Sequence, residues 1–334
     1  HAIAQADRFL YMPIDFPSCV EPVVKTIGPD PFVLMETELW PNLVHSLKRV
    51  GATVVLANGR ISDRSFPRYR RLRRFFGPVL EEMDLFLMSS ELDAQRIQAM
   101  GAHVDRIKVT GNTKFDALPG ATDPSIANEM RELLQLDPSD PVIVAGSTHP
   151  GEHEIVLDAY NRLTEAFPDL VLVLVPRHVE KTPAIVSAMA DRHMEAPFLR
   201  SAADRGETRN GRKVVIVDRT GELFRIYSLA SVVFVGGSLV PRGGQNILEP
   251  AAWGKVVLFG PSMEDFRDAR DSLVRAGAGK EVHGVYDLVT HLQQVLADAA
   301  AAQRLGARGR EAILSHVGSA RRNADLLAAR VKQG

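Results

Sequence analysis

The stretch from Val232 to Pro261, VVFVGGSLVPRGGQNILEPAAWGKVVLFGP, constrains the fold of this chain more than any other part of the sequence. Residues 232–235 form a short β-branched run, typical of a strand buried in a parallel sheet. A glycine pair, Gly236-Gly237, follows the run and allows a sharp turn close to a ligand. A second glycine pair precedes a predicted helix over 245–253 and a returning strand over 255–259. This order of elements predicts a parallel α/β sheet.

The same alternation of short apolar strands and helical segments runs through the rest of the chain. Strands are predicted at 30–35, 53–57, 85–89 and 107–110 in the first half, and at 141–145, 170–175 and 213–217 in the second. Strands that alternate with helices at this spacing predict a doubly wound α/β fold. The Pro- and Gly-rich segment 118–125 is the best linker, and we expect two domains, residues 1–119 and 120–334.

The charge balance of the chain excludes a global attraction to nucleic acid or to a membrane. Its 40 basic and 41 acidic residues give a net charge of −1, so any such attraction must be local. The one cysteine, Cys19, excludes an internal disulfide. The His and Cys residues show no metal-type spacing, and we therefore expect no metal. No apolar run approaches the roughly 18 residues of a membrane-spanning helix.

Residues suited to a phosphate or a sugar follow the predicted strands of the second half. Ligands of open α/β sheets bind outside the carboxyl ends of the strands. Small hydroxylated residues and an arginine lie there, and the predicted helix over 245–253 carries Asn246 and Glu249 on one face of its first turn. We expect a nucleotide site. The alternatives are that the glycines only form tight turns and that Arg177 forms a surface ion pair.

Two features of the first half also indicate charged ligands. Glu36 and Glu38 follow a strand and point the same way on an extended segment, unless one of them only caps the next helix. The segment RSFPRYRRLRRFF, residues 64–76, interleaves arginines with aromatic residues. Arginine suits phosphate, and a basic amphipathic helix suits an anionic bilayer. A solvated helix face or a nucleic-acid patch would carry the same charges.

Several blocks of sequence, spread over about 230 residues, resemble the 3-deoxy-D-manno-octulosonic acid (Kdo) transferases of lipopolysaccharide assembly. The blocks are METELWPN (35–42), ANGRISDRS (57–65), GNTKFD (111–116), AGSTHPGEHE (145–154), VPRH (175–178) and FVGGSLVPRGGQNILEPAAWGKVVLFGP (234–261). They occur in the order found in the family. Together they are a far more specific signal than any single glycine pair.

The resemblance implies a fold, a reaction and a location. The fold is GT-B, in which two Rossmann-like domains face a cleft. The reaction moves Kdo from CMP-Kdo, held mainly by residues 120–334, to a lipid A precursor (lipid IVA), held mainly by residues 1–119. It inverts the anomeric centre and needs neither a metal nor a cofactor other than the donor. These enzymes work at the cytoplasmic face of the inner membrane, and nucleic acid is not an expected partner.

The resemblance also assigns roles to individual positions. Contacts with CMP-Kdo are expected from Gly146, Ser147, Thr148, Arg177, His178, Gly236, Gly237, Ser238, Asn246 and Glu249. Glu38, with Glu36 beside it, is expected near the acceptor. The phosphates of lipid A, or the membrane surface, are expected to meet Arg60, Arg64, Arg68, Arg70 and Arg71.

The sequence departs from the family at its beginning. Family members normally start with a membrane-anchoring helix and a strand that ends in a glycine-rich turn carrying the glutamate taken as the general base. No residue here corresponds to that segment, so we expect a transferase fragment with an incomplete first domain and an intact donor site. The alternatives are a different GT-B transferase or epimerase that uses a UDP-sugar, a non-catalytic module that binds a nucleotide-sugar or a lipid, and a nucleic-acid-binding protein.

Overall fold

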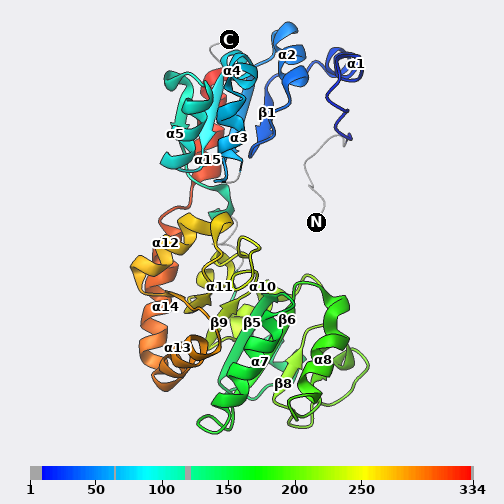
Figure 1. Cartoon of the computed structure of the whole chain (residues 1–334), viewed down its shortest axis with the longest axis vertical. Coiled ribbons are helices and arrows are strands. Elements are labelled where there is room, and N and C mark those ends of the chain that lie inside the picture. Colours follow the sequence, from blue (N-terminus) through cyan, green and yellow to red (C-terminus); the bar gives the residue numbers. More distant parts are fainter. Residues whose placement is uncertain (1–9, 64, 117–121, 332–334) are drawn as a thin grey trace. The chain divides into compact units, whose positions relative to one another are not determined.

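The computed structural model describes residues 10–63, 65–116 and 122–331 (Figure 1). The chain divides into two compact units. One comprises residues 1–113 together with 318–334, and the other comprises residues 114–317. Each unit contains its own parallel sheet covered by helices, and the α/β class predicted from the sequence is confirmed.

The first unit is built on a four-stranded parallel sheet in the order β1-β2-β3-β4. Its strands are β1 (Phe32–Met35), β2 (Val54–Gly59), β3 (Leu85–Met88) and β4 (Ile107–Val109). The four strands predicted for this half are confirmed, with small differences at their ends. β2 and β3 are buried along their whole length, which explains their continuous apolar runs.

The helices of the first unit begin where the sequence supplies suitable first residues. Proline lies at the start of three of them, where its missing N–H costs no hydrogen bond. Ser90 caps a fourth through its side chain, which accepts the Asp93 N–H at 3.1 Å. These helices are α1 (Pro17–Ile27), α2 (Pro41–Arg49), α3 (Phe66–Arg71), α4 (Arg73–Glu82) and α5 (Glu91–Met100), with the short 3₁₀ segment η1 (Val104–Arg106).

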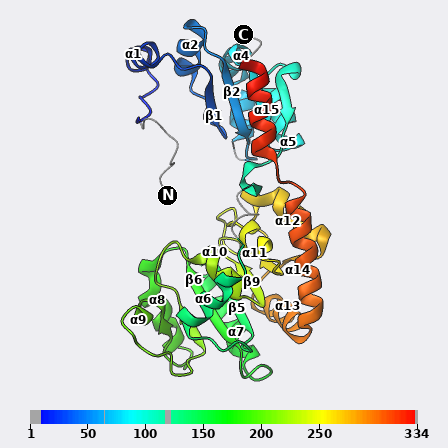
Figure 2. The ribbon, with the colours of Figure 1, turned by 180° about the vertical axis from the view of Figure 1, so that it is seen from behind.

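The helix at the end of the described chain, α15 (Ser319–Val331), belongs to the first unit (Figure 2). The sequence-based division placed all of residues 120–334 in the second domain, and α15 departs from that division. Its Leu326 and Leu327 pack against an apolar face of the first sheet formed by Val55, Ala57, Leu85 and Leu87. The helix lies there because these buried strand residues need an apolar cover on that face.

The second unit is built on a seven-stranded parallel sheet in the order β11-β10-β9-β5-β6-β8-β7. Its strands are β5 (Val142–Thr148), β6 (Val171–Pro176), β7 (Phe198–Leu199), β8 (Val214–Ile216), β9 (Val232–Val235), β10 (Val257–Phe259) and β11 (Gly279–Glu281). From β5 the chain first adds strands on one side and then, from β9, on the other. The strand order therefore reverses between β5 and β9, where a ligand crevice is expected.

Alternate residues of the central strands enter two separate cores in the second unit. Val142 and Val144 of β5 face one core, and Ile143 and Ala145 face the other. The covering helices are α6 (Ser125–Leu134), α7 (Glu152–Leu163), α8 (Thr182–Ala190), α9 (Arg200–Ala203), α10 (Leu223–Ile226), α11 (Leu248–Ala252), α12 (Arg267–Ala276), α13 (Val285–Ala297) and α14 (Ala299–Leu314). The 3₁₀ segments are η2 (Thr113–Phe115), η3 (Val179–Lys181), η4 (Tyr227–Leu229) and η5 (Glu264–Phe266).

The helix predicted over 245–253 is shorter than expected, because α11 begins only at Leu248. The side-chain oxygen of Asn246 accepts the backbone N–H of Leu248 at 3.1 Å. This local turn competes with a helical start at Gln245. Within the described ranges, no helix is both long and apolar enough to cross a membrane.

Candidate functional site

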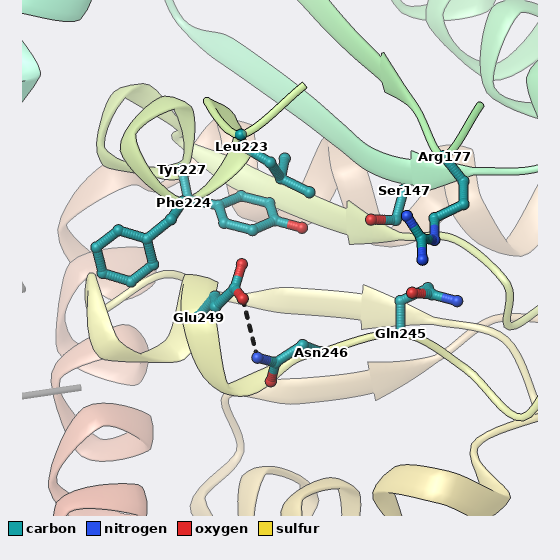
Figure 3. Close-up of a pocket in the computed structure, with 9 residues that line it drawn as sticks. Ser147, Arg177, Leu223, Phe224, Tyr227, Gln245, Asn246 and Glu249 are labelled. Carbon is teal, nitrogen blue, oxygen red and sulfur yellow. Dashed lines mark hydrogen bonds between the residues drawn. The ribbon is translucent and has the colours of Figure 1, made fainter. Parts of the chain in front are cut away.

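A cavity of about 280 Å³ opens in the second unit at the carboxyl ends of β5 and β6, beside the point where the strand order reverses (Figure 3). It is lined by Ser147, Arg177, Gly221, Leu223, Phe224, Tyr227, Gln245, Asn246 and Glu249. Four of these nine residues, Ser147, Arg177, Asn246 and Glu249, were predicted as donor contacts from the sequence. The structure thus brings together side chains from positions up to a hundred residues apart in the chain.

The end of β5 places a hydroxyl in the cavity through a local irregularity of the strand. The register of β5 with β6 shifts between Gly146 and Thr148, and Ser147 between them has a φ of 52°. A left-handed conformation in a non-glycine residue is uncommon and is concentrated at functional sites. Gly146 is required as glycine, because a Cβ there would lie 2.2 Å from the hydroxyl oxygen of Tyr227.

One wall of the cavity is aromatic and apolar. Tyr227 is 1% exposed, and its burial raises the pKa of its hydroxyl well above 10.0, with Glu249 adding to the effect. The phenol is therefore neutral and can donate a hydrogen bond. Phe224 packs against Trp253 with ring centroids 5.6 Å apart. Such a wall suits the flat face of a base or the apolar face of a sugar.

The facing wall is polar and held by an internal hydrogen bond. The Nδ2 atom of Asn246 donates to Oε1 of Glu249 at 3.0 Å, so the two side chains meet although Asn246 precedes α11 and does not lie on a helix face as predicted (Figure 3). Burial raises the pKa of Glu249, and the Asn246 hydrogen bond acts in the opposite direction by favouring the charged form. A carboxylate oriented in this way is a good acceptor for sugar hydroxyls.

Arg177 supplies the positive charge of the cavity. Its backbone N–H donates to the carbonyl of Thr148 at 3.0 Å, which ties the end of β6 to the end of β5. Its guanidinium points toward Ser147 and Gln245 (Figure 3). No ion pair joins it to a carboxylate among the described residues, so the surface ion pair considered as an alternative is not formed. A free guanidinium at a strand end suits a phosphate.

The predicted contacts at Gly236, Gly237 and Ser238 lie behind the cavity and do not line it. The carboxylate of Glu152, which is fully buried, accepts the N–H groups of Gly237 at 2.7 Å and Ser238 at 3.0 Å. It also accepts the N–H groups of Leu239 and His149. These N–H groups are engaged by the protein itself, and they brace two loops together at the strand ends.

Two other predicted donor residues also lie outside the lining. Thr148 is buried, and its hydroxyl lies 3.0 Å from Nδ1 of His153. His178 is exposed, with its Nδ1 atom 3.4 Å from Glu180. Its ring packs edge to face on His149 with centroids 5.7 Å apart. A donor contact by these residues stays a prediction.

The first unit holds the predicted acceptor residues. Glu36 follows β1 with a φ of 60°, in a turn over 36–37, so the extended segment expected for Glu36 and Glu38 is wrong. Arg60 follows β2. Glu38 accepts a hydrogen bond from the Trp40 ring nitrogen at 2.9 Å. The exposed arginines of α3 are Arg68, Arg70 and Arg71, and Arg64 lies outside the described residues. Their roles stay predictions.

Sequence reasoning missed five lining residues. They are Gly221, Leu223, Phe224, Tyr227 and Gln245. The first three could have been predicted, because they follow the carboxyl end of β8, and ligands of open α/β sheets bind outside the carboxyl ends of the strands. Tyr227 carried no such signal, since its place in the cavity depends on packing against Gly146. Among the described residues, no three His, Cys, Asp or Glu side chains are grouped to hold a metal ion.

Comparison with known proteins identifies the family. The family described as "3-Deoxy-D-manno-octulosonic-acid transferase (kdotransferase)" matches residues 1–117. The 3-deoxy-D-manno-octulosonic acid transferase of Haemophilus influenzae is 31% identical over 319 residues, which cover 95% of this chain and 73% of that protein. A bifunctional glycosyltransferase/methyltransferase of Fusobacterium nucleatum is 33% identical over 86% of this chain, and the match covers 44% of its length.

Two solved structures are similar to this chain, one at a level that bears on the family and one in fold alone. The C-terminal CMP-Kdo binding domain of WaaA from Acinetobacter baumannii is 27% identical, with a TM-score of 0.52, over 57% of this chain and 97% of that one. A glycosyltransferase from Rickettsia africae has a TM-score of 0.63 over 95% of this chain and 81% of that one, at 14% identity, and it shows the shared fold alone. On the identity and coverage of the Haemophilus relative, this chain belongs to the 3-deoxy-D-manno-octulosonic acid transferase family.

Proposed function

We propose that this protein is a glycosyltransferase that transfers Kdo from CMP-Kdo to a lipid A precursor, and that the cavity of the second unit holds the donor. The observation that carries the proposal is the meeting of Arg177, Ser147, Asn246 and Glu249 in one cavity. The similarity of 57% of this chain to a domain named for CMP-Kdo binding also supports the proposal.

The chemistry of the cavity walls suits a nucleoside monophosphate with an attached sugar. Arg177 and the Ser147 hydroxyl would bind the phosphate. Asn246 and Glu249 would bind hydroxyl groups, and Phe224 and the Tyr227 ring would cover an apolar face of the ligand.

In the proposed reaction, a hydroxyl oxygen of the acceptor bonds to the anomeric carbon of Kdo as the bond from that carbon to the CMP oxygen breaks. The bonding electrons leave with CMP, and the proton of the acceptor hydroxyl passes to a general base or to water. A single displacement of this kind inverts the anomeric centre, and we propose that no metal takes part. Arg177 would stabilise the charge that grows on the phosphate of the leaving CMP.

The first unit is proposed to meet the acceptor and the membrane. Glu36 and Glu38 would lie near the acceptor hydroxyl, and Arg60 near its phosphates. Helix α3 presents arginines, and the exposed Leu72 and Phe75, at 51% and 60%, follow it. Basic and apolar side chains side by side suit the headgroup region of an anionic bilayer. We propose the cytoplasmic face of the inner membrane as the location.

Calorimetric titration of CMP into the protein tests the donor site. We expect CMP to bind more tightly than UDP, and we expect Arg177→Ala to weaken CMP at least about tenfold, because it removes a charge-assisted contact. Arg205→Ala is the control, since Arg205 is exposed in the same unit and pairs with Glu207. Tighter binding of UDP would favour a UDP-sugar enzyme, and no binding of either nucleotide would contradict the proposed donor site.

A further inference from the structure

A second group of cationic and imidazole side chains lies beside the cavity, at the same strand ends. His149 is two residues beyond Ser147, and His178 directly follows Arg177. The two imidazole rings pack edge to face with centroids 5.7 Å apart. The loop that carries Arg242 packs on the same strand end, because a Cβ on Gly151 would lie 3.7 Å from Val240.

Two polar groups of this cluster have no partner of their own among the described residues. The Nε2 atom of His149 is buried and has no hydrogen-bond partner among the described residues. Buried polar atoms in folded proteins almost always have a partner, so the Nε2 atom of His149 is a hydrogen-bonding group that the described residues leave unused. The exposed guanidinium of Arg242 forms no ion pair with a carboxylate in the described part of the chain.

Charged groups of both signs surround His149. Burial is the largest cause that lowers its pKa, the carboxylate of Glu152 opposes this effect, and His178, Arg242 and Arg177 lower the pKa further. Two carboxylates lie close by. Glu152, which acts against these causes, is already engaged by four backbone N–H groups, and Glu180 pairs with His178. A neutral imidazole with an unused nitrogen and a guanidinium without an ion-pair partner are both groups that bind anions.

We propose that His149, His178 and Arg242 form a second anion subsite, which binds the carboxylate of an acidic sugar nucleotide while Arg177 binds its phosphate. The inference rests on the proposed function, because it takes the cavity as the nucleotide site. The second subsite would explain why the protein prefers a donor with an acidic sugar. A donor whose sugar is an acid places two negative charges close together, and a donor with a neutral sugar leaves the second subsite unpaired.

The test measures dissociation constants for two probes, CMP and CMP-Kdo. The protein variants are Arg242→Gln and His149→Gln, and the control is Arg205→Gln, which removes an equal charge elsewhere in the second unit. Arg242 is exposed, so its variant tests the subsite even if substitution of the partly buried His149 impairs folding.

We expect the wild-type protein to bind CMP-Kdo more tightly than CMP. Arg242→Gln and His149→Gln should each weaken the binding of CMP-Kdo about tenfold or more, because a hydrogen bond from a charged or buried donor to a carboxylate contributes that much to affinity. The dissociation constant for CMP should stay within about twofold of the wild-type value. Equal affinity of the wild-type protein for the two probes would overturn the inference. So would variants that weaken both probes alike, or neither. Failure of the wild-type protein to bind CMP at all would instead overturn the proposed function.

Discussion

The strand ends of the two units look alike in backbone conformation and differ in what surrounds them. Ser147, near the end of β5, has a φ of 52°, and Glu36, directly after β1, has a φ of 60°. In the second unit the irregular strand end is enclosed, with a buried carboxylate behind it and an aromatic wall opposite. In the first unit the charged residues of α3 are exposed. Enclosure suits a small ligand that must be held in one pose, and an exposed basic surface suits an extended anionic partner.

The largest expected effect comes from removing the buried carboxylate of Glu152, which holds two loops of the second unit together. Glu152→Gln replaces a carboxylate that accepts four N–H groups by an amide that directs its own N–H groups at them. We expect the free energy of unfolding to fall by about 2–4 kcal/mol, because buried donors lose a charged acceptor. Urea unfolding measures the change. Glu165→Gln, at an exposed site in the same unit, is the control and should change stability by less than about 0.5 kcal/mol. An equally small effect of Glu152→Gln would show that the enclosure does not depend on this carboxylate.

A smaller effect is expected from the acid of the cavity wall. Burial raises the pKa of Glu249 above its usual value of 4.5, so the folded state keeps its proton to a higher pH than the unfolded state does. Stability therefore decreases as pH rises from the unfolded pKa through the raised folded pKa. Glu249→Gln removes this dependence. We expect the unfolding free energy of wild type to fall relative to that of the variant as pH rises from the unfolded pKa to the folded pKa of Glu249. Urea unfolding at a series of pH values measures this difference. A difference that is constant with pH would contradict the burial of this carboxyl.

The smallest effect on stability is expected from the exposed surface of the first unit. The triple variant Arg68→Gln, Arg70→Gln, Arg71→Gln should change the free energy of unfolding by less than about 0.5 kcal/mol per site, because exposed side chains contribute little. Binding to vesicles that contain anionic phospholipid should nevertheless weaken, since each arginine near such a surface contributes about 1 kcal/mol. Sedimentation with anionic and with neutral vesicles measures this, and added salt should weaken wild-type binding too. Unchanged binding to anionic vesicles would contradict the proposal that the exposed arginines of the first unit bind an anionic surface.

The sequence predicted the strands well, because buried parallel strands consist of continuous β-branched and apolar runs. It predicted that Asn246 and Glu249 lie close together, but for the wrong reason, because Asn246 forms a turn before α11 and is not part of the helix. It did not predict the role of Glu152, because the alternation of elements says where the residue lies along the chain and not which backbone groups surround it. For the same reason Tyr227 was missed, and α15 was assigned to the wrong unit. An amphipathic helix reveals its apolar face, but not which sheet that face will cover.

The placement of α15 has a consequence for how the protein is made. The ribosome produces the four strands of the first unit before the second unit, yet the helix whose leucines pack against Val55 and Leu87 follows the second unit in the sequence. Throughout translation of the second unit, the nascent first sheet presents an uncovered apolar face. Premature termination after residue 317 would spare every strand of both sheets and still leave that face bare, as a target for chaperones and for aggregation.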